Sequence, residues 1–284
     1  MSGSVVVGDT RAEALPLIDG SVQTTVTSPP YWGQRDYGYA DQSGIEQTYT
    51  EYLDWWRSVC AEVHRVTAAS GTWWLNVGDT YNTRATIRPS AHQGGVGHDN
   101  ESIRMTWADH RDRGLVRYSA RQPGFKDKDL MGLPWLMASI AQEVGWWLRC
   151  DVIWAKPYGM SENAPDRPAR SHEYMFLFAK SRQGVKSRRT PYMNEHRSVW
   201  PIAPRHGAAG PASFPEELVQ RCLEGTSDPG DLVLDPFGGA GTTAVVAERM
   251  SRRAVAFDAA PADLLTAWWN RAYGTADESM EATA

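Results

Sequence analysis

The amino-acid sequence predicts an α/β protein built on a mostly parallel, doubly wound sheet. Runs rich in β-branched and aromatic residues alternate with helical patterns along most of the chain, as in strands joined by crossover helices. Two neighbouring runs, "CDVIWAK" (150–156) and "HEYMFLFAK" (172–180), have no helical pattern between them and indicate an antiparallel excursion. Near the end, "DLVLDPFGGAGTTAVVAERM" (231–250) reads as a strand, a glycine turn and a helix.

The first expected strand, "SVQTTVTSP" (21–29), is a β-branched run that must stop at Pro29 and Pro30, because proline donates no backbone hydrogen bond and has a fixed φ. A helical pattern at 48–67 and a strand pattern at 71–79 follow it. The remaining strands are expected at 150–156, 172–180, 231–237 and 253–258, and the remaining helices at 133–148, 215–226, 242–250 and 262–273.

The chain of 284 residues suits one large domain with an insertion. Residues 80–128 are rich in Gly, Arg, His and Ser, have weak periodicity and are too long for an ordinary connection, so they are expected to form an inserted recognition or lid region. Residues 1–79 and 129–270 then form a single α/β domain. The small and acidic residues 271–284 are expected to be a flexible tail.

The formal net charge of −5 argues weakly against a nucleic-acid partner, but the charge is distributed unevenly. Residues 84–128 hold nine basic and five acidic side chains, and residues 180–205 hold seven basic side chains and one acidic one. Two solvated loops and two phosphate-binding segments are both compatible with this pattern.

Cysteine usage and the N-terminus indicate a cytoplasmic protein. The 3 cysteines are far apart and form no C-x-x-C pair, so neither a disulfide framework nor a metal site is expected. The opening "MSGSVVVGDT" lacks the basic start of a signal peptide, and Gln142 and Glu143 interrupt the most apolar long stretch, so no membrane span is expected.

The glycine turn near the end predicts a nucleotide-like ligand. Gly239, Gly241 and Ala244 fit the pattern G-x-G-x-x-A, in which glycines allow close approach of the backbone to a ligand. Asp258 ends the next expected strand, where a carboxylate can accept hydrogen bonds from both ribose hydroxyls. Asp235 at the preceding strand end would repel a pyrophosphate but suits a cationic neighbourhood, which favours S-adenosylmethionine over a nicotinamide dinucleotide. A purely structural strand-turn-helix is the other alternative.

The combined motifs resemble those of the exocyclic-amino DNA methyltransferases. Ser28-Pro29-Pro30-Tyr31 precedes Asp235-Pro236-Phe237-Gly238-Gly239-Ala240-Gly241-Thr242-Thr243, which is the permuted, β-class order of that family. The segments "SGTWWLNVGDTY", "RCDVIWAKP" and "RSHEYMFLFAK" also occur in the family's order. The resemblance implies a Rossmann-like S-adenosylmethionine-dependent fold and a double-stranded DNA substrate.

By resemblance, the cofactor-binding residues fall into three groups along the chain. They are Asp9, then Phe214 and Pro215, and finally Asp235, Pro236, Phe237, Gly238, Gly239, Gly241, Thr242, Thr243 and Asp258. The chain departs from the family at Gly210, four residues before Phe214, where a histidine is common.

The catalytic residues expected are Ser28, Pro29, Pro30 and Tyr31. An exocyclic amine has its lone pair delocalised into the ring and needs preorganised acceptors for its hydrogens before it can attack a methyl group. Ser28 Oγ and the Pro29 carbonyl are expected to accept from the amine, while Tyr31 stacks on a base flipped out of the duplex and Trp32 extends that wall. A structural bend with aromatic residues in the core is the alternative.

The target base is expected to be cytosine. Ring-carbon methylation needs a cysteine nucleophile, usually in a Pro-Cys turn, and no cysteine of this chain follows a proline. In the resembling family, serine at the first motif position usually accompanies cytosine N4 methylation, although adenine N6 methylation uses the same acceptors. An RNA or small-molecule methyltransferase and a non-catalytic DNA-binding module are the rival classes.

Residues that would contact DNA are expected in several segments that follow the catalytic motif. The resemblance places Trp154 and Lys156 of "W-x-K-P" beside the catalytic pocket, in contact with the flipped base or its phosphate, and a structural strand end is the alternative. His172 and Glu173 also match the family pattern, and His172 is expected to be a core residue. The basic loop 180–205 is expected to share target recognition with residues 80–128. The residues proposed to contact DNA in these segments are Arg117, Arg121, Arg188 and Arg189. The enzyme is expected to be a monomer or homodimer, with a cognate restriction endonuclease as a further partner.

Overall fold

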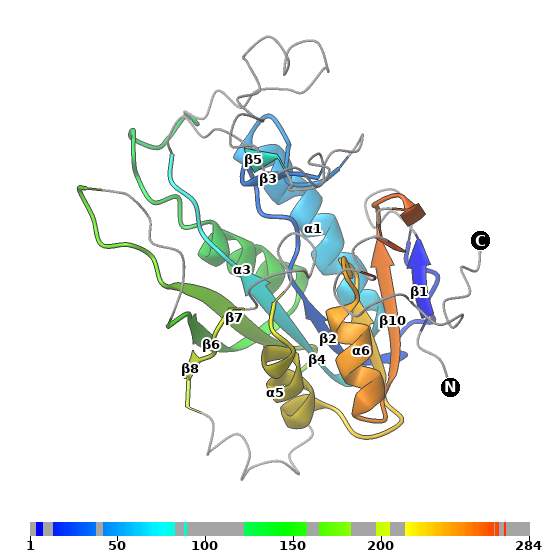
Figure 1. Ribbon diagram of the computed structural model, residues 1–284. Helices are drawn as coiled ribbons and strands as arrows, with labels where there is room; N and C mark the ends of the chain where they lie inside the picture. Colours follow the sequence, from blue (N-terminus) through cyan, green and yellow to red (C-terminus); the bar gives the residue numbers. More distant parts are fainter. Residues whose placement is uncertain are drawn as a thin grey trace.

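A computed structural model describes residues 4–7, 14–37, 42–82, 88–89, 122–157, 165–182, 197–204, 214–263, 265–266 and 270 (Figure 1). Its main sheet has eight strands in the order β1-β10-β9-β2-β4-β7-β6-β8. The strands are β1 (Ser4–Val7), β2 (Val22–Thr27), β4 (Thr67–Val77), β6 (Trp147–Ala155), β7 (His172–Ala179), β8 (Val199–Pro201), β9 (Leu232–Asp235) and β10 (Arg253–Asp258).

The direction of the strands confirms the mostly parallel sheet with an antiparallel excursion. The pairs β1–β10, β10–β9, β9–β2 and β2–β4 are parallel, and so is β6–β8. Strand β7 runs antiparallel to both of its neighbours, β4 and β6. The carboxyl ends of the other strands therefore share one edge of the sheet with the amino end of β7, and we call this edge the carboxyl edge.

Helices cover both faces of the sheet. Helices α1 (Tyr49–Val66) and α3 (Leu133–Val144) pack together, as do α5 (Glu216–Thr226) and α6 (Thr242–Arg249) (Figure 1). The side chain of Trp73 enters the core beneath α1 and α3, whereas that of its neighbour Trp74 enters the core beneath α5. This alternation follows from the two-residue period of a strand and makes β4 a central strand buried on both faces. Among the described residues, no helix combines the length and apolar character needed to cross a bilayer.

The observed elements differ from the sequence expectations mainly at their ends. Helix α3 ends at Val144 instead of residue 148, because Gly145 adopts a φ of +120° and Trp147 already belongs to β6. Strand β4 begins at Thr67 instead of residue 71. Strands β1 and β8, and a two-stranded parallel sheet of β3 (Arg35–Asp36) and β5 (Arg88–Pro89), were not expected. Part of the helix expected at 262–273 lies outside the described residues.

The two flanks of the inserted region are fastened to each other. Asn82 Nδ2 donates to the carbonyls of Phe125 and Lys126, both at 3.1 Å, and Asn82 Oδ1 accepts from the Gln122 backbone N–H at 2.8 Å. Two backbone hydrogen bonds, Asn82 N–H to the Asp129 carbonyl and Lys128 N–H to the Asn82 carbonyl, complete this Asn82 clasp. Residues 83–87 and 90–121 lie outside the described residues.

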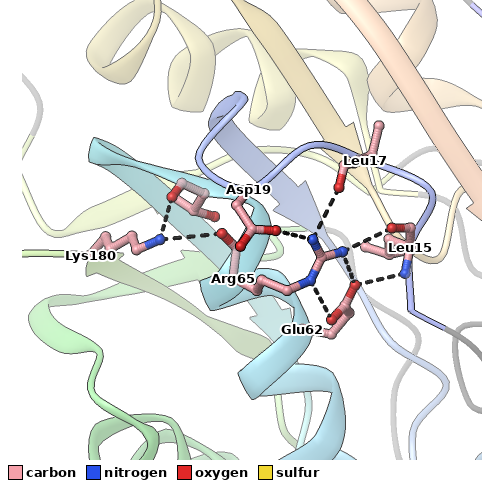
Figure 2. Close-up of polar contacts among 7 residues, drawn as sticks. Leu15, Leu17, Asp19, Glu62, Arg65 and Lys180 are labelled. Atoms are coloured by element: carbon pink, nitrogen blue, oxygen red, sulfur yellow. Dashed lines mark hydrogen bonds and ion pairs between the residues drawn. The ribbon is translucent and has the colours of Figure 1, made fainter.

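A polar cluster fastens the opposite, amino edge of the sheet (Figure 2). The guanidinium of Arg65, near the end of α1, donates to the Glu62 carboxylate, to the Leu15 and Leu17 carbonyls and to Asp19. These acceptors hold the segment that leads into β2. Lys180, which follows β7, donates to the carbonyls of Arg65 and Thr67. We call these residues, Leu15, Leu17, Asp19, Glu62, Arg65, Thr67 and Lys180, the amino-edge cluster.

Candidate active site

The predicted catalytic and glycine-loop motifs meet at the carboxyl edge. Ser28 follows β2, and Pro236 follows β9, which pairs directly with β2. Asp258 ends β10, the strand on the other side of β9. Parallel pairing therefore brings together motifs that are about two hundred residues apart in the sequence, at the edge where open α/β sheets bind ligands.

The glycine loop is shaped by close backbone packing. A Cβ atom added at Gly238 would lie 2.8 Å from the Ala256 Cβ, so no larger residue fits against β10. Gly239 and Gly241 adopt left-handed φ values of +50° and +78°, which favour glycine, and Gly241 is the N-cap of α6. Within the described part of the chain, no atom lies within 4 Å of a Cβ added at Gly239. The loop therefore presents backbone to open space in front of a helix N-terminus.

Asp258 holds this loop through backbone hydrogen bonds. Its Oδ2 accepts from the Gly239 N–H and its Oδ1 from the Ala260 N–H, both at 2.8 Å. Burial raises the pKa of the Asp258 carboxyl, while these two hydrogen bonds lower it. Each oxygen retains a lone pair, so the geometry leaves acceptor capacity for a ligand hydroxyl.

Asp235 connects the glycine loop to the catalytic motif. Its Oδ1 accepts from the Thr27 hydroxyl at 2.6 Å and from the Phe237 N–H at 3.1 Å, and its Oδ2 accepts from the Thr243 hydroxyl at 2.7 Å. Burial raises the pKa of Asp235 to about 6, against the lowering effect of these hydrogen bonds. Both oxygens thus serve contacts within the protein, and the residue before Ser28 is tied to the start of α6.

A buried hydroxyl without a partner among the described residues lies at the start of α6. Thr242 is 3% exposed, and its Oγ1 has no hydrogen-bond partner among the described residues. A buried hydroxyl without a partner is costly, so a ligand that supplies one would stabilise this site. The hydroxyl of Thr242, the Gly239 backbone and the Asp258 carboxylate together offer donors and acceptors that suit a ligand carrying both charged and hydroxyl groups.

The Pro-Pro turn is held by a helix on one side. The Tyr52 hydroxyl of α1 donates to the Pro30 carbonyl at 2.9 Å. The Trp32 indole N–H donates to the Glu46 carbonyl at 3.0 Å, and Trp32 is 5% exposed, so its ring is part of the core. Tyr31 packs over Gly78, where an added Cβ would lie 2.9 Å from the Tyr31 ring.

Ser28 and Tyr31 belong to a polar network that spans four strand ends. Ser28 Oγ donates to the Tyr31 hydroxyl at 3.3 Å, and that hydroxyl lies 3.0 Å from Glu173 Oε2 and 3.2 Å from Asn76 Oδ1. Asn76 Nδ2 donates to Glu173 Oε2 at 3.1 Å, and Lys156 pairs with Glu173 Oε1. Burial and the charge of Glu173 raise the pKa of Tyr31 well above its usual value. We call these five residues the Tyr31 network.

Sequence reasoning did not assign two members of this network to the site. Asn76 is a polar residue within the buried end of β4, and Glu173 is a carboxylate at the start of β7. Each is a polar side chain at the end of an apolar strand pattern. This position was the one feature of the sequence that could have indicated a role in the site. The register of the antiparallel pair β4–β7 brings them together.

The structure places the other predicted site residues as follows. Trp154 is 3% exposed, its indole N–H donates to the Ile202 carbonyl at 2.9 Å, and the Lys156 ammonium lies 4.2 Å from its ring centre. Phe214 is buried in the core beneath α5, and Pro215 is the N-cap of α5. The predicted residues outside the described part of the chain are Asp9, Arg117, Arg121, Arg188 and Arg189.

Comparison with known proteins identifies related chains. A family model for N6/N4 methyltransferases, described as DNA methylase, matches residues 22–265. Type II methyltransferase M.XycI of Xanthomonas campestris pv. cyanopsidis is 38% identical over 262 residues, which are 89% of this chain and 82% of the relative. Type II methyltransferase M.SmaI of Serratia marcescens is 37% identical over 273 residues, which are 90% of this chain and 86% of the relative.

Solved structures show the same fold. The PvuII DNA methyltransferase, which is cytosine-N4-specific, superposes with a TM-score of 0.66 at 21% identity, covering 95% of this chain and 86% of that one. TTHA0409 from Thermus thermophilus, complexed with S-adenosyl-L-methionine, superposes with a TM-score of 0.61 at 24% identity, covering 95% and 93%. The family match across the sheet and both motifs, together with relatives that align over most of their length, shows that the protein belongs to the N6/N4 family of DNA methylases.

Proposed function

We propose that this DNA methylase transfers a methyl group from S-adenosylmethionine to the exocyclic N4 amine of a cytosine flipped out of duplex DNA. The observation that carries the proposal is the junction at Asp235, whose two carboxylate oxygens tie the acceptor loop at Ser28 to the glycine loop. A methyl donor at one loop and an amine at the other are then held in a fixed relation, which is how an enzyme lowers the entropic part of a barrier.

The cofactor would be held by the glycine loop and α6. The Gly239 backbone leaves room for close approach, and the Asp258 oxygens retain lone pairs for ribose hydroxyls. The Thr242 hydroxyl, which has no partner in the described part of the chain, offers a further polar contact. When bound, S-adenosylmethionine supplies an electrophilic methyl group whose C–S bond breaks with its electron pair on sulfur as a C–N bond forms. The complex of TTHA0409 with S-adenosyl-L-methionine supports this assignment.

The amine would be held by Ser28 and Pro29. The Tyr52 hydroxyl occupies the Pro30 carbonyl, so we assign the amine's second hydrogen to the Pro29 carbonyl and its first to Ser28 Oγ. Acceptors fixed in this way favour a tetrahedral nitrogen with an available lone pair. Serine in this position and the likeness to the cytosine-N4-specific PvuII enzyme both support cytosine over adenine.

Recognition of DNA would involve residues 80–128 together with the basic loop 180–205. The Asn82 clasp supports a separate role for the insertion, because it fixes the base of the insertion beside α1. There the Gln122 side chain accepts from the Tyr49 N–H at 3.2 Å. Deletion of residues 84–124 should weaken DNA binding and blur sequence preference more than it weakens cofactor binding. The Type II methyltransferase relatives support a cognate restriction endonuclease as the biological partner.

The deciding experiment measures methyl transfer from labelled S-adenosylmethionine into duplex DNA, followed by digestion to nucleosides and mass identification. N4-methylcytosine is the expected product. N6-methyladenine would retain the mechanism and overturn the choice of base. Incorporation into RNA but not into duplex DNA would overturn the proposed substrate.

A further inference from the structure

The Tyr31 hydroxyl occupies a position that dictates the direction of its hydrogen bonds. It has one hydrogen, and two oxygens lie within reach of that hydrogen: Glu173 Oε2 at 3.0 Å and Asn76 Oδ1 at 3.2 Å. An ionised carboxylate can only accept. The Asn76 amide is oriented by its own Nδ2, which donates to Glu173 Oε2 and to the Tyr174 carbonyl, so its Oδ1 also accepts. The Tyr31 hydrogen must therefore point to one of these two oxygens.

This arrangement fixes the hydroxyl of Ser28 as well. With its hydrogen engaged, the Tyr31 oxygen offers lone pairs to Ser28 Oγ, which lies 3.3 Å away and donates to it. Serine is normally free to donate or accept. Here its hydrogen points toward Tyr31, and its lone pairs are left for another donor. An exocyclic amine presents N–H donors, so the network prepares Ser28 for such a group.

We propose that Glu173 is the positioning residue that turns Ser28 into a hydrogen-bond acceptor and that it receives, through Tyr31 and Ser28, the proton released by the methylated amine. This proposal rests on the proposed function. It gives the Tyr31 hydroxyl a role in addition to any stacking of its ring on the base.

This hydrogen-bonded chain gives the proton lost by the methylated amine an acceptor. Once the nitrogen lone pair has formed the C–N bond, the nitrogen carries a positive charge and must lose one proton. That proton passes to Ser28 Oγ as the Ser28 hydroxyl proton passes to the Tyr31 oxygen and the Tyr31 proton passes to Glu173 Oε2. The positive charge that entered with the methyl donor is thus cancelled on a carboxylate, and both hydroxyls end neutral with their hydrogen bonds reversed.

The surroundings of Glu173 suit this task. Lys156 holds its other oxygen, and the Lys156 ammonium in turn lies over the Trp154 ring, so the carboxylate is fixed in place. The Glu173 side chain is 19% exposed, which gives the proton a way to solvent before the next turnover. A carboxylate serving only to stabilise the fold would not need the hydroxyls of Tyr31 and Ser28 in series with it.

Two isosteric variants test the proposal. Glu173→Gln removes the carboxylate, and Tyr31→Phe removes the hydroxyl while keeping the ring and the Lys156–Glu173 pair. We expect each to lower the single-turnover rate of methyl transfer by about 100-fold, with the Kd values for DNA and S-adenosylmethionine retained. Because the groups act in series, the double variant should be no slower than either single variant. Glu143→Gln, at an exposed carboxylate paired with Arg57 at 2.7 Å, is the matched control and should retain the wild-type rate.

Several results would overturn the proposal. A Tyr31→Phe enzyme within about twofold of the wild-type rate would show that the ring alone matters. Multiplicative losses in the double variant would show that the two groups do not act in series. Should Glu173→Gln fail to fold because Lys156 loses its counter-ion, Tyr31→Phe still decides the question.

A second measurement does not depend on activity. In protein labelled with 3-fluorotyrosine, ¹⁹F NMR follows the ionisation of Tyr31, whose signal is identified by its loss in Tyr31→Phe. Burial, followed by the charge of Glu173, raises the pKa of Tyr31, and the hydrogen bond from Ser28 lowers it, so Glu173→Gln should let Tyr31 ionise at lower pH. An unchanged titration would overturn the coupling. The expected titration in an enzyme that methylates no DNA would instead refute the proposed function and leave the orientation of Tyr31 intact.

Discussion

The amino-edge cluster and the Tyr31 network lie at opposite edges of the same sheet. Both contain a glutamate and a lysine, but they differ in whether hydrogen-bonding groups remain available. At the amino edge, all five N–H groups of the Arg65 guanidinium have acceptors, and those acceptors are carboxylates and carbonyls of neighbouring turns (Figure 2). At the carboxyl edge, the hydrogen bonds of Ser28 and Tyr31 run in one direction and leave lone pairs of Ser28 available. The donors of Arg65 are all used within the fold, whereas Ser28 keeps acceptor lone pairs that we propose for the substrate amine.

The largest expected effect separates activity from stability at the carboxyl edge. Ser28→Ala removes an acceptor for the amine and should lower the single-turnover rate of methyl transfer by about 10²- to 10³-fold, as loss of one preorganised hydrogen bond at a reacting centre does. The free energy of unfolding should change little, because Ser28 is not fully buried. Rapid-quench kinetics and urea unfolding measure the two quantities. A rate within threefold of wild type would show that Ser28 is not the acceptor.

The next effect concerns pH and the junction at Asp235. Its folded pKa of about 6 lies above the usual value of 3.8, so the folded state binds a proton more tightly than the unfolded state does. This stabilising contribution is complete below about pH 4 and is lost as the pH rises through about 6, with a total of about 3 kcal/mol. Asp235→Asn cannot titrate, so the stability advantage of wild type over this variant should shrink by that amount between pH 4 and pH 7.5. Urea unfolding at both pH values measures it, and a constant difference would refute the raised pKa.

The smallest of the three effects belongs to the amino edge. Arg65→Met leaves the carboxylates and carbonyls of the amino-edge cluster without their donor and should lower the free energy of unfolding by about 2 kcal/mol. The value is modest because the Arg65 side chain is 32% exposed and water can replace part of the lost interaction. The transfer rate per folded molecule should stay at the wild-type value. A loss of transfer rate without a loss of unfolding free energy would show that the amino-edge cluster acts on the Tyr31 network at the opposite edge.

Most of the architecture could be predicted from the sequence, because the patterns that indicate strands, helices and turns involve neighbouring residues. The β-branched run that stops at Pro29, the glycine loop and the alternation of strands and helices each reflect neighbouring residues, and each is confirmed in the fold. Strands β1 and β8 have only four and three residues, and whether such short runs pair depends on β10 and β6 beside them. Trp147 reads as helical from its neighbours, yet Gly145 ends the helix before it.

The site was predictable where it follows a motif and not where it depends on register. Short patterns predicted that Ser28 and Gly239 belong to the candidate site, whereas Glu173 received no role there from its motif match. Its contact with Tyr31 exists because β7 runs antiparallel to β4, with Tyr174 opposite Val77. A shift of the register by one residue would turn the Glu173 side chain to the other face of the sheet. No local feature of the sequence encodes that register.

Given the proposed role of residues 80–128 in DNA recognition, the Asn82 clasp has a consequence for how the target sequence can change over evolutionary time. Asn82 joins both ends of the insertion. The positions of these two ends on the domain therefore do not depend on the length of the segment between them. The entropy of closing a loop grows only slowly with its length, so insertions and exchanges there cost the domain little. Descendants of one ancestor could thus acquire different segments at this junction while inheriting the same chemistry unchanged.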